Sequence, residues 1–283
     1  MTTAVLLSAM TGVDDNDPET AKAEALAGTD FTQFLSRDAL DGVRVGVPVW
    51  NDEAFEQYFE ENSVTDSDQQ ESLREALSAG NEDALKQIET LSAAGVTAVE
   101  VPATAIPSAY ELGVDVQAAL EYGFKQAINT FLANLGEDAP VGSLEELIAF
   151  NNEDLANRAP YGQDHLEGSQ NTAVSAAEYR EMEQGNQVTA RDALDQLFEG
   201  YDIDVVVSAV GQLYAPAGYP ALTVPSGYAE DGTPMGIVFV GGFLSEPQLL
   251  AVGYAYEQAT QARVTPDLEA TMQLIESIGE SSP

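Results

Sequence analysis

Short apolar runs alternate along the chain with longer segments in which apolar residues recur every three or four positions. The first run, at 43–48, is rich in β-branched residues and follows the turn-like pair Asp41-Gly42, a pattern typical of a buried strand. Four further runs predict strands at 96–101, 203–207, 221–224 and 235–240. Asp231-Gly232 lies between the last two runs and favours a turn that joins them.

Helical periodicity fills much of the remaining chain. Apolar residues recur at helical intervals from Leu73 to Leu91, with a break near Gly80-Asn81 and a stop at Gly95. The clearest pattern is an apolar stripe with steps of four and three, made of Leu120, Phe124, Ile128, Phe131 and Leu135. We predict that this stripe marks a core helix and not a cofactor site, because an apolar helix face must pack on something. A further helix is predicted at 176–198.

Two helix starts carry capping signals. Ser143 and Glu146 have the spacing of a capping box ahead of an apolar run. Ser245-Glu246-Pro247-Gln248 combines an N-cap serine, a proline in the first turn and a capping glutamine, and it predicts a helix through Tyr256.

The alternation of strands and helices predicts the fold class. We expect an α/β protein with a mixed sheet of about five strands covered by helices. No internal repeat or linker divides the sequence, so residues 1–283 are predicted to form a single α/β region. The residues at 276–283 are predicted to be a frayed tail.

The charge is strongly unbalanced, with 48 acidic and 10 basic residues among 283 and a formal net charge of −38. Lysine and arginine are scattered without a cluster, so we expect no nucleic-acid partner. The acidic residues are spread out, which indicates a solvated surface suited to a salt-filled cytoplasm, because molar salt shortens the Debye length to about 3 Å. The acidic segment 14–19 lacks the glycine and distant glutamate of an EF-hand, so we interpret it as surface.

The chain has no cysteine and one histidine, His165, which excludes thiolate chemistry and histidine-pair metal sites. His165 lies beside Asp164, and a surface or hydrogen-bonded role is expected for it ahead of catalysis. No run approaches the roughly 20 apolar residues of a membrane span, and residues 1–10 show no basic leader. We therefore expect a cytoplasmic protein with no membrane partner, no metal and no cofactor.

Signatures of enzyme chemistry are missing from the sequence. There is no Gly-x-Ser-x-Gly elbow, no Ser-x-x-Lys pair, no glycine-rich phosphate loop and no His-Glu-x-x-His motif. A carboxylate pair for glycoside hydrolysis stays open, because none of the 48 acidic residues stands out.

Several segments, taken in order, match the sequence pattern of one enzyme family. The most specific is Ala217-Gly218-Tyr219-Pro220-Ala221-Leu222-Thr223-Val224-Pro225-Ser226-Gly227, and the others are 4–14, 17–20, 40–48, 143–151, 160–163, 234–237 and 243–247. Together they resemble the C-terminal part of the amidase signature family, in its peptide-amidase-like branch. The resemblance implies hydrolysis of carbon–nitrogen amide bonds in small amide or peptide-amide substrates.

The resemblance also implies that the catalytic core lies elsewhere. Members of the family use a serine nucleophile, a second serine in a cis peptide and a lysine on a Ser/Gly-rich segment that would precede Met1, so no catalytic residue is assigned. Ser208-Ala209-Val210-Gly211 replaces a family run that usually ends in Pro-Thr, so the resemblance does not carry over that part of the substrate pocket. Tyr161, Gln163 and Tyr219 are candidates for the substrate-pocket wall, since polar-tipped residues beside glycine can point into a cleft. Ordinary loop packing is the equally expected alternative for all three.

Three functional hypotheses follow. The chain is a truncated or split amidase that is inactive alone, or a non-catalytic subunit that binds a separate chain bearing the catalytic core. The third hypothesis is an amidotransferase A-type subunit with tRNA-linked partners. The Pro160-Tyr161-Gly162-Gln163 segment disfavours it, because that branch typically has a basic Phe-Gly-x-Glu stretch there. Because sheet strands of the family would be missing, we also expect self-association or loose packing, with exposed apolar surface at Leu6-Leu7, 205–207 and 221–224.

Overall fold

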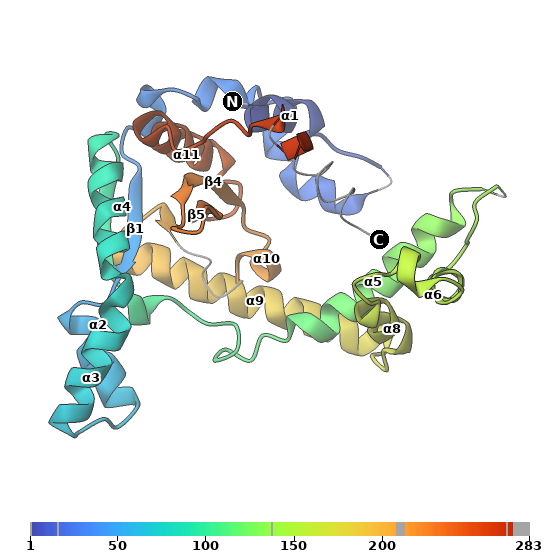
Figure 1. The fold of residues 1–283 in the computed structure, drawn as a ribbon, viewed down its shortest axis with the longest axis horizontal. Helices are drawn as coiled ribbons and strands as arrows, with labels where there is room; N and C mark the ends of the chain where they lie inside the picture. The colour runs from blue at the N-terminus through green and yellow to red at the C-terminus, as the bar shows by residue number, and fades with distance from the viewer. Residues whose placement is uncertain (1, 16, 137, 208–212, 270, 274–283) are drawn as a thin grey trace.

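A mixed five-stranded sheet forms the centre of the computed structural model, which describes residues 2–15, 17–136, 138–207, 213–269 and 271–273 (Figure 1). Within these residues the strands are β1 (Arg44–Val49), β2 (Thr97–Pro102), β3 (Val205–Val207), β4 (Ala221–Tyr228) and β5 (Pro234–Gly241). Their order across the sheet is β2-β1-β3-β5-β4. β1 pairs in parallel with β2 and β3, whereas β5 pairs antiparallel with β3 and β4. The predicted fold class is confirmed.

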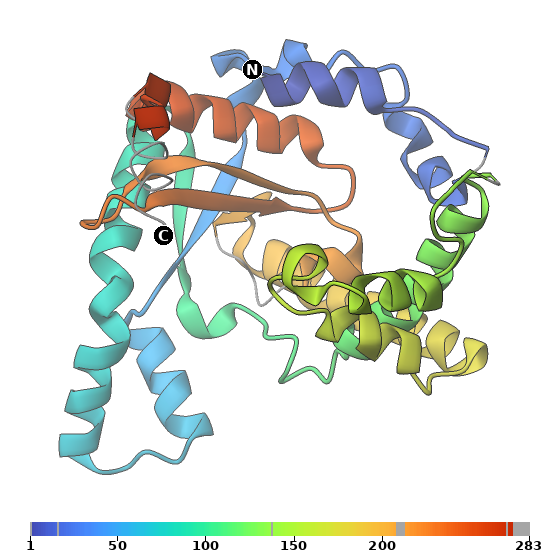
Figure 2. The ribbon, with the colours of Figure 1, turned by 45° about the vertical axis from the view of Figure 1, so that its right-hand side comes forward.

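Helices surround this sheet (Figures 1 and 2). The α-helices are α1 (Thr2–Met10), α2 (Asp52–Glu61), α3 (Ser67–Leu77), α4 (Asn81–Ala93), α5 (Val116–Ala133), α6 (Leu144–Asn152), α7 (Leu155–Arg158), α8 (Asp164–Asn171), α9 (Ala176–Tyr201), α10 (Tyr214–Ala217) and α11 (Glu246–Thr260). Short 3-10 helices are η1 (Pro18–Leu26), η2 (Phe31–Phe34), η3 (Arg37–Leu40), η4 (Ser78–Gly80) and η5 (Ala103–Ala105). The predicted break near Gly80 is confirmed, because η4 separates α3 from α4. The expected tail at 276–283 and the segment 208–211 lie outside the described residues.

The two faces of the sheet are covered by different helices. Side chains alternate along β3, so Val205 and Val207 point to the core under α4 and α11, while Val206 points to the core under α9. Leu249 and Tyr256 of α11 fill the first core, and the Tyr256 ring meets Phe239 edge-on with 5.9 Å between ring centres. In the second core, small and branched side chains of α9 pack on β2, β3 and β5 through Ala190, Leu194 and Leu197.

The capping signals have different outcomes. The Ser143 hydroxyl accepts a hydrogen bond from the Glu146 backbone N–H, and the Glu146 carboxylate accepts one from the Gly142 backbone N–H. The predicted start of α6 is therefore confirmed. The helix predicted from the Ser245-Glu246-Pro247-Gln248 pattern is confirmed as α11, with a proline in its first turn. The expected capping bond is absent: within the described part of the chain, the Ser245 hydroxyl caps no backbone N–H and is buried without a partner. Its ψ of 18° departs from the extended backbone that aims an N-cap side chain at the first turn.

Two groups of helices lie away from the sheet and from the helices α4, α9 and α11 that cover its faces (Figure 2). α2 and α3 project from one edge of the sheet and enclose their own aromatic cluster, in which Phe55 and Phe59 stack and Arg74 lies over both rings. α5, α6 and α8 pack together near the start of α9, where Lys125 Nζ donates a 2.6 Å hydrogen bond to the Gln170 carbonyl.

The core-helix prediction for α5 is wrong. Within the predicted stripe, Leu120, Phe124, Phe131 and Leu135 are 60%, 41%, 59% and 52% exposed. α5 packs beside α6, α8 and α9, and its buried residue is Leu132, which lies outside the stripe. The periodicity therefore identified an apolar helix face correctly, but the described residues do not cover that face.

The prediction of exposed strands is also wrong for β3. Val205 to Val207 are all buried, because β3 lies between β1 and β5 and both faces are covered by helices. β4 is an edge strand, on which Ala221 is exposed and Val224 is buried. On α1, Leu6 is exposed, whereas Leu7 packs against a small cluster with Phe31.

Candidate functional site

A groove of about 530 Å³ lies between α5 and α9. Its apolar lining comes from α5, through Val116, Ala119, Leu120, Gly123, Phe124 and Ala127. Its polar lining comes chiefly from α9, through Tyr179, Glu183, Asn186 and Gln187. Glu19 of η1 and residues of α10 complete it. An apolar surface with a few polar groups is the usual composition of a small-molecule site, so this groove is the candidate substrate site.

A glycine lets the two helices approach at this groove. A Cβ atom at Gly123 would lie 3.3 Å from the hydroxyl of Tyr179, so a larger residue would press on the tyrosine. The Tyr179 ring stacks on Tyr122 with 4.7 Å between ring centres. Asn186 Nδ2 donates a hydrogen bond of 2.8 Å to the Asp115 carbonyl and ties the start of α5 to α9. These contacts hold Tyr179 beside the apolar stripe.

Carboxylates set the electrostatics of the groove. Burial raises the pKa of the Tyr179 hydroxyl above its usual value, and the negative charges of Glu183 and Glu19 raise it further. The hydroxyl therefore keeps its proton at neutral pH and can donate a hydrogen bond to a ligand. Glu19 is also paired with Lys22 at 2.5 Å on the surface. The groove thus offers a fixed donor and an acidic edge beside apolar side chains.

Tyr219, one of the predicted wall residues, is buried against α9. Its hydroxyl donates a hydrogen bond of 2.6 Å to Oδ1 of Asp195. Burial raises the pKa of Tyr219 well above its usual range, Asp195 raises it further, and the nearby Arg191 charge opposes the shift. The Arg191 guanidinium lies 5.8 Å from the centre of the Tyr219 ring and 5.2 Å from that of Phe243, and its Nε donates to the Ala217 carbonyl at 2.7 Å. This cluster fastens α10 to α9.

The other two predicted wall residues lie at the start of α8. Tyr161 is fully exposed. Gln163 is buried, and its Nε2 donates to Oδ1 of Asn152 at 2.8 Å and to Oε1 of Glu167 at 3.0 Å, while its Oε1 accepts from Asn151 Nδ2 at 3.2 Å. Tyr161, Gln163 and Tyr219 are not brought together in the groove lining. Their role in substrate binding stays a prediction.

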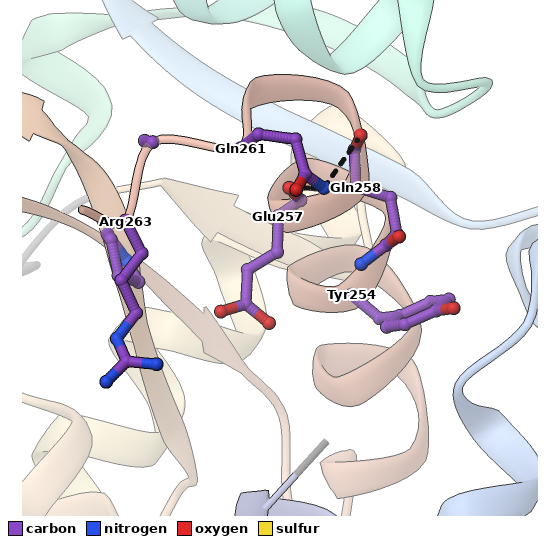
Figure 3. Close-up of a pocket in the computed structure, with 7 residues that line it drawn as sticks. Tyr254, Glu257, Gln258, Gln261 and Arg263 are labelled. Carbon is purple, nitrogen blue, oxygen red and sulfur yellow. Dashed lines mark hydrogen bonds between the residues drawn. The ribbon is translucent and has the colours of Figure 1, made fainter. Parts of the chain in front are cut away.

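A second pocket, of about 390 Å³, lies at the end of α11 (Figure 3). Gln261 ends the helix in a left-handed conformation, and its side-chain amide donates to the carbonyls of Glu257 and Gln258 at 3.2 and 3.4 Å. Figure 3 shows the side chains of Glu257 and Arg263 extended on the same side of the pocket. The lining residues include no serine, lysine or histidine, so they do not supply the serine and lysine that the family resemblance implies.

The described ranges contain no candidate metal site and no candidate membrane-spanning helix. Those residues hold no group of three or more His, Asp or Glu side chains that could bind a metal ion. His165 is exposed on α8. Within the same ranges, no helix is both long enough and apolar enough to cross a membrane.

Comparison with known sequences points to amide-processing enzymes. No family model matches the chain. A probable amidase from Arabidopsis thaliana is 28% identical over 267 residues, which are 92% of this chain and 47% of that protein. A glutamyl-tRNA(Gln) amidotransferase subunit from Thermodesulfovibrio yellowstonii is 24% identical across 91% of this chain and 52% of its own length. The chain thus spans about half the length of the curated relatives it matches.

Solved structures agree with these relatives. An amidase family protein from Bacillus anthracis superposes with a TM-score of 0.72 at 31% identity, over 93% of this chain and 47% of that one. The peptide amidase of Stenotrophomonas maltophilia gives a TM-score of 0.66 at 27% identity, over 93% of this chain and 52% of that one. These likenesses support the predicted membership of the amidase signature family and confirm its α/β fold.

Sequence reasoning missed the groove itself. Its walls come from α5 and α9, which are distant in the sequence, and no local pattern pairs them. One signal was present: Gly123 interrupts a strongly apolar helix, and an isolated glycine inside a helical pattern often marks a close helix contact.

Proposed function

We propose that this chain provides the substrate-binding part of an amide hydrolase whose nucleophile lies on another segment of polypeptide. The single observation that carries the proposal is the groove between α5 and α9, in a chain whose fold matches a peptide amidase. Hydrolysis of a peptide amide adds water across the carbon–nitrogen bond, giving a carboxylic acid and ammonia. The serine nucleophile, second serine and lysine that the family resemblance implies are not assigned to any residue here.

The groove would hold an apolar side chain of the substrate. Leu120 and Phe124 supply apolar surface, and the protonated hydroxyl of Tyr179 can donate to a substrate carbonyl. Tyr161, Gln163 and Tyr219 remain proposed substrate-binding residues from the family resemblance. We favour peptide amides over a tRNA-linked role because the two superposed structures are an amidase family protein and a peptide amidase.

A second candidate function is that of a binding or assembly subunit without catalysis of its own. The exposed apolar surface of α5 favours it, because such a surface is typical of an interface. Both proposals predict that the purified chain alone hydrolyses no amide, since a positioned nucleophile and its base supply most of the rate.

Ammonia release from an N-acylated phenylalanine amide in molar KCl tests the proposal. The chain alone is expected to be inactive, and the chain together with a polypeptide that corresponds to the unmatched part of its relatives is expected to hydrolyse the amide. In that mixture Leu120→Ala should lower kcat/KM about tenfold, because truncating a side chain that contacts substrate loses roughly 1–3 kcal/mol of binding. Leu85→Ala, at an exposed leucine of α4, is the matched control and should leave kcat/KM unchanged. Turnover by the chain alone, abolished by a substitution within it, would show that the chemistry lies in this chain. A mixture that binds but does not hydrolyse would favour the assembly subunit.

A further inference from the structure

Polar groups converge on the α9 side of the groove between α5 and α9. Tyr179, Glu183 and Asn186 follow one another along α9 at intervals of four and three residues, so they share one helix face, and all three line the groove. Glu19 of η1 adds a second carboxylate to the same lining. The charges of Glu183 and Glu19 both raise the pKa of the Tyr179 hydroxyl, which requires that the two carboxylates lie near it. The groove therefore gathers two negative charges around one tyrosine.

No positive side chain balances these charges inside the groove. Its lining contains no lysine or arginine, and Lys22, which pairs with Glu19, is not part of it. Among the residues that the structure describes, the Glu183 carboxylate has neither a hydrogen bond nor an ion pair. Asn186 donates to the Asp115 carbonyl through Nδ2, which leaves its Oδ1 as a further acceptor. An unpaired carboxylate and an acceptor beside apolar side chains attract a cationic group on a ligand.

We infer that the groove prefers amides whose apolar side chain lies beside a free, positively charged amine, and that Glu183 binds this amine. The inference rests on the proposed function and adds the charge of the substrate. The chemical class is the amide of an apolar amino acid with a free α-ammonium group. Leu120 and Phe124 of α5 would contact the side chain, while Glu183 of α9 would bind the ammonium group that branches from the same carbon atom. The rings of Phe124 and Tyr179 also line the groove, and aromatic rings attract cations.

Ligand binding to the full chain tests the inference without any need for hydrolysis. The probes are phenylalanine amide and N-acetylphenylalanine amide, which share the side chain and the amide but differ in charge. Their dissociation constants are measured by ligand-observed NMR titration in molar KCl at about pH 6.5, below the usual α-amino pKa of about 7.7–8.0, so that the amine is protonated. Phenylalanine amide is expected to bind about threefold more tightly. The expected preference is small because Glu183 is exposed, and exposed ion pairs change an equilibrium constant by only about 1.5- to 5-fold.

Three variants assign the preference to its residues. Glu183→Gln should remove the preference for phenylalanine amide and leave the affinity for the N-acetylated amide unchanged. Glu181→Gln is the matched control, because Glu181 is also exposed on α9 but does not line the groove, and it should keep the preference. Leu120→Ala should weaken both ligands, since both place the same side chain against α5. Thermal melts of the three variants show whether each one folds.

The outcomes separate this inference from the proposed function. Equal affinity for the two ligands, or a preference that survives Glu183→Gln, would overturn the inference, while weaker binding of both ligands to Leu120→Ala would still support the groove as the substrate site. If neither ligand binds, or if Leu120→Ala changes neither affinity, both the groove and the inference are overturned. A preference that Glu181→Gln removes as fully as Glu183→Gln would show that the net charge of the chain attracts the amine, and would overturn the role of Glu183.

Discussion

Replacing Gly46 with alanine should destabilise the protein, because β1 has no room for a methyl group there. Gly46 is buried in β1 and lies opposite Val99 of β2 and Val206 of β3. A Cβ atom at this position would lie 2.5 Å from Cδ1 of Ile203 and 2.9 Å from Cγ2 of Val101. Valine is stiff at χ1 and Val101 is fully buried, so relief requires movement of the packed core.

The magnitude follows from two opposing terms. Overpacking a well-packed core costs about 1–3 kcal/mol. Replacing glycine by alanine also restricts the unfolded chain, which returns roughly 0.4–1 kcal/mol. The net loss in the free energy of unfolding should be about 1–2 kcal/mol, or roughly 2–8 °C in melting temperature for a chain of this length.

Gly185→Ala provides the matched control. Gly185 lies within α9, and a Cβ atom added there would have no described atom within 4 Å other than its chain neighbours and its own helix backbone. Alanine is the better helix former, so this variant should gain about 0.5–1 kcal/mol. Urea unfolding of both variants in molar KCl measures the two changes. If Gly46→Ala is as stable as the unchanged chain, or if the two variants shift in the same direction, the packing argument is refuted.

Three further predictions concern charge and hydrogen bonding. The melting temperature should rise between 0.1 and 1 M KCl, because the Debye length shrinks from about 10 to 3 Å around a chain of charge −38, and a flat profile would contradict the proposed salt adaptation. Hydrogen bonds from the Ser175 side chain and backbone lower the pKa of Glu178, so its contribution to stability is present above pH 4.5 and is lost as the pH falls through the lowered pKa. The melting-temperature difference between Glu178→Gln and the unchanged chain should therefore shrink below pH 4.5, and a difference that grows there would reverse the sign of this argument. Tyr219→Phe should cost about 0.5–1.5 kcal/mol in urea unfolding, since it removes one hydrogen bond to Asp195, which is exposed and can turn to water. A loss above about 3 kcal/mol would show that Asp195 is not rehydrated.

Local patterns predicted most of the strands and helices of this fold. The run at 43–48 became β1 and the run at 235–240 became β5, because buried strands need continuous apolar residues whatever their partners are. The turn at Asp231-Gly232 formed as expected, with Gly232 at positive φ and the Thr233 N–H bound to the Asp231 carboxylate. These features depend on a few neighbouring residues, so a single sequence contains enough information to predict them.

The candidate site depends on contacts between distant residues, and the sequence alone did not reveal them. The Tyr219 hydroxyl donates to Asp195 of α9, and the Gln163 side chain is hydrogen-bonded to Asn151 and Glu167, contacts that the neighbouring glycines do not predict. Their neighbouring glycines indicated loops correctly. Neither the neighbours nor the spacing could show whether the side chains turn toward a groove or into the packed chain, because that choice is made by α9 and α6.

The sequence also could not show what covers the apolar stripe of α5. Burying a leucine or phenylalanine side chain contributes about 1.5–3 kcal/mol to stability, so covering a face with four such residues is strongly favourable. Periodicity reports this face but carries no information about what covers it. A helix that packs inside its own chain and one that packs on another polypeptide have the same pattern. In this chain the described residues leave Leu120, Phe124, Phe131 and Leu135 open, and the relatives are about twice as long. Leu120 and Phe124 face the groove between α5 and α9, so a ligand bound there would cover this part of the stripe, and the apolar pattern would be the same as for a face covered by protein.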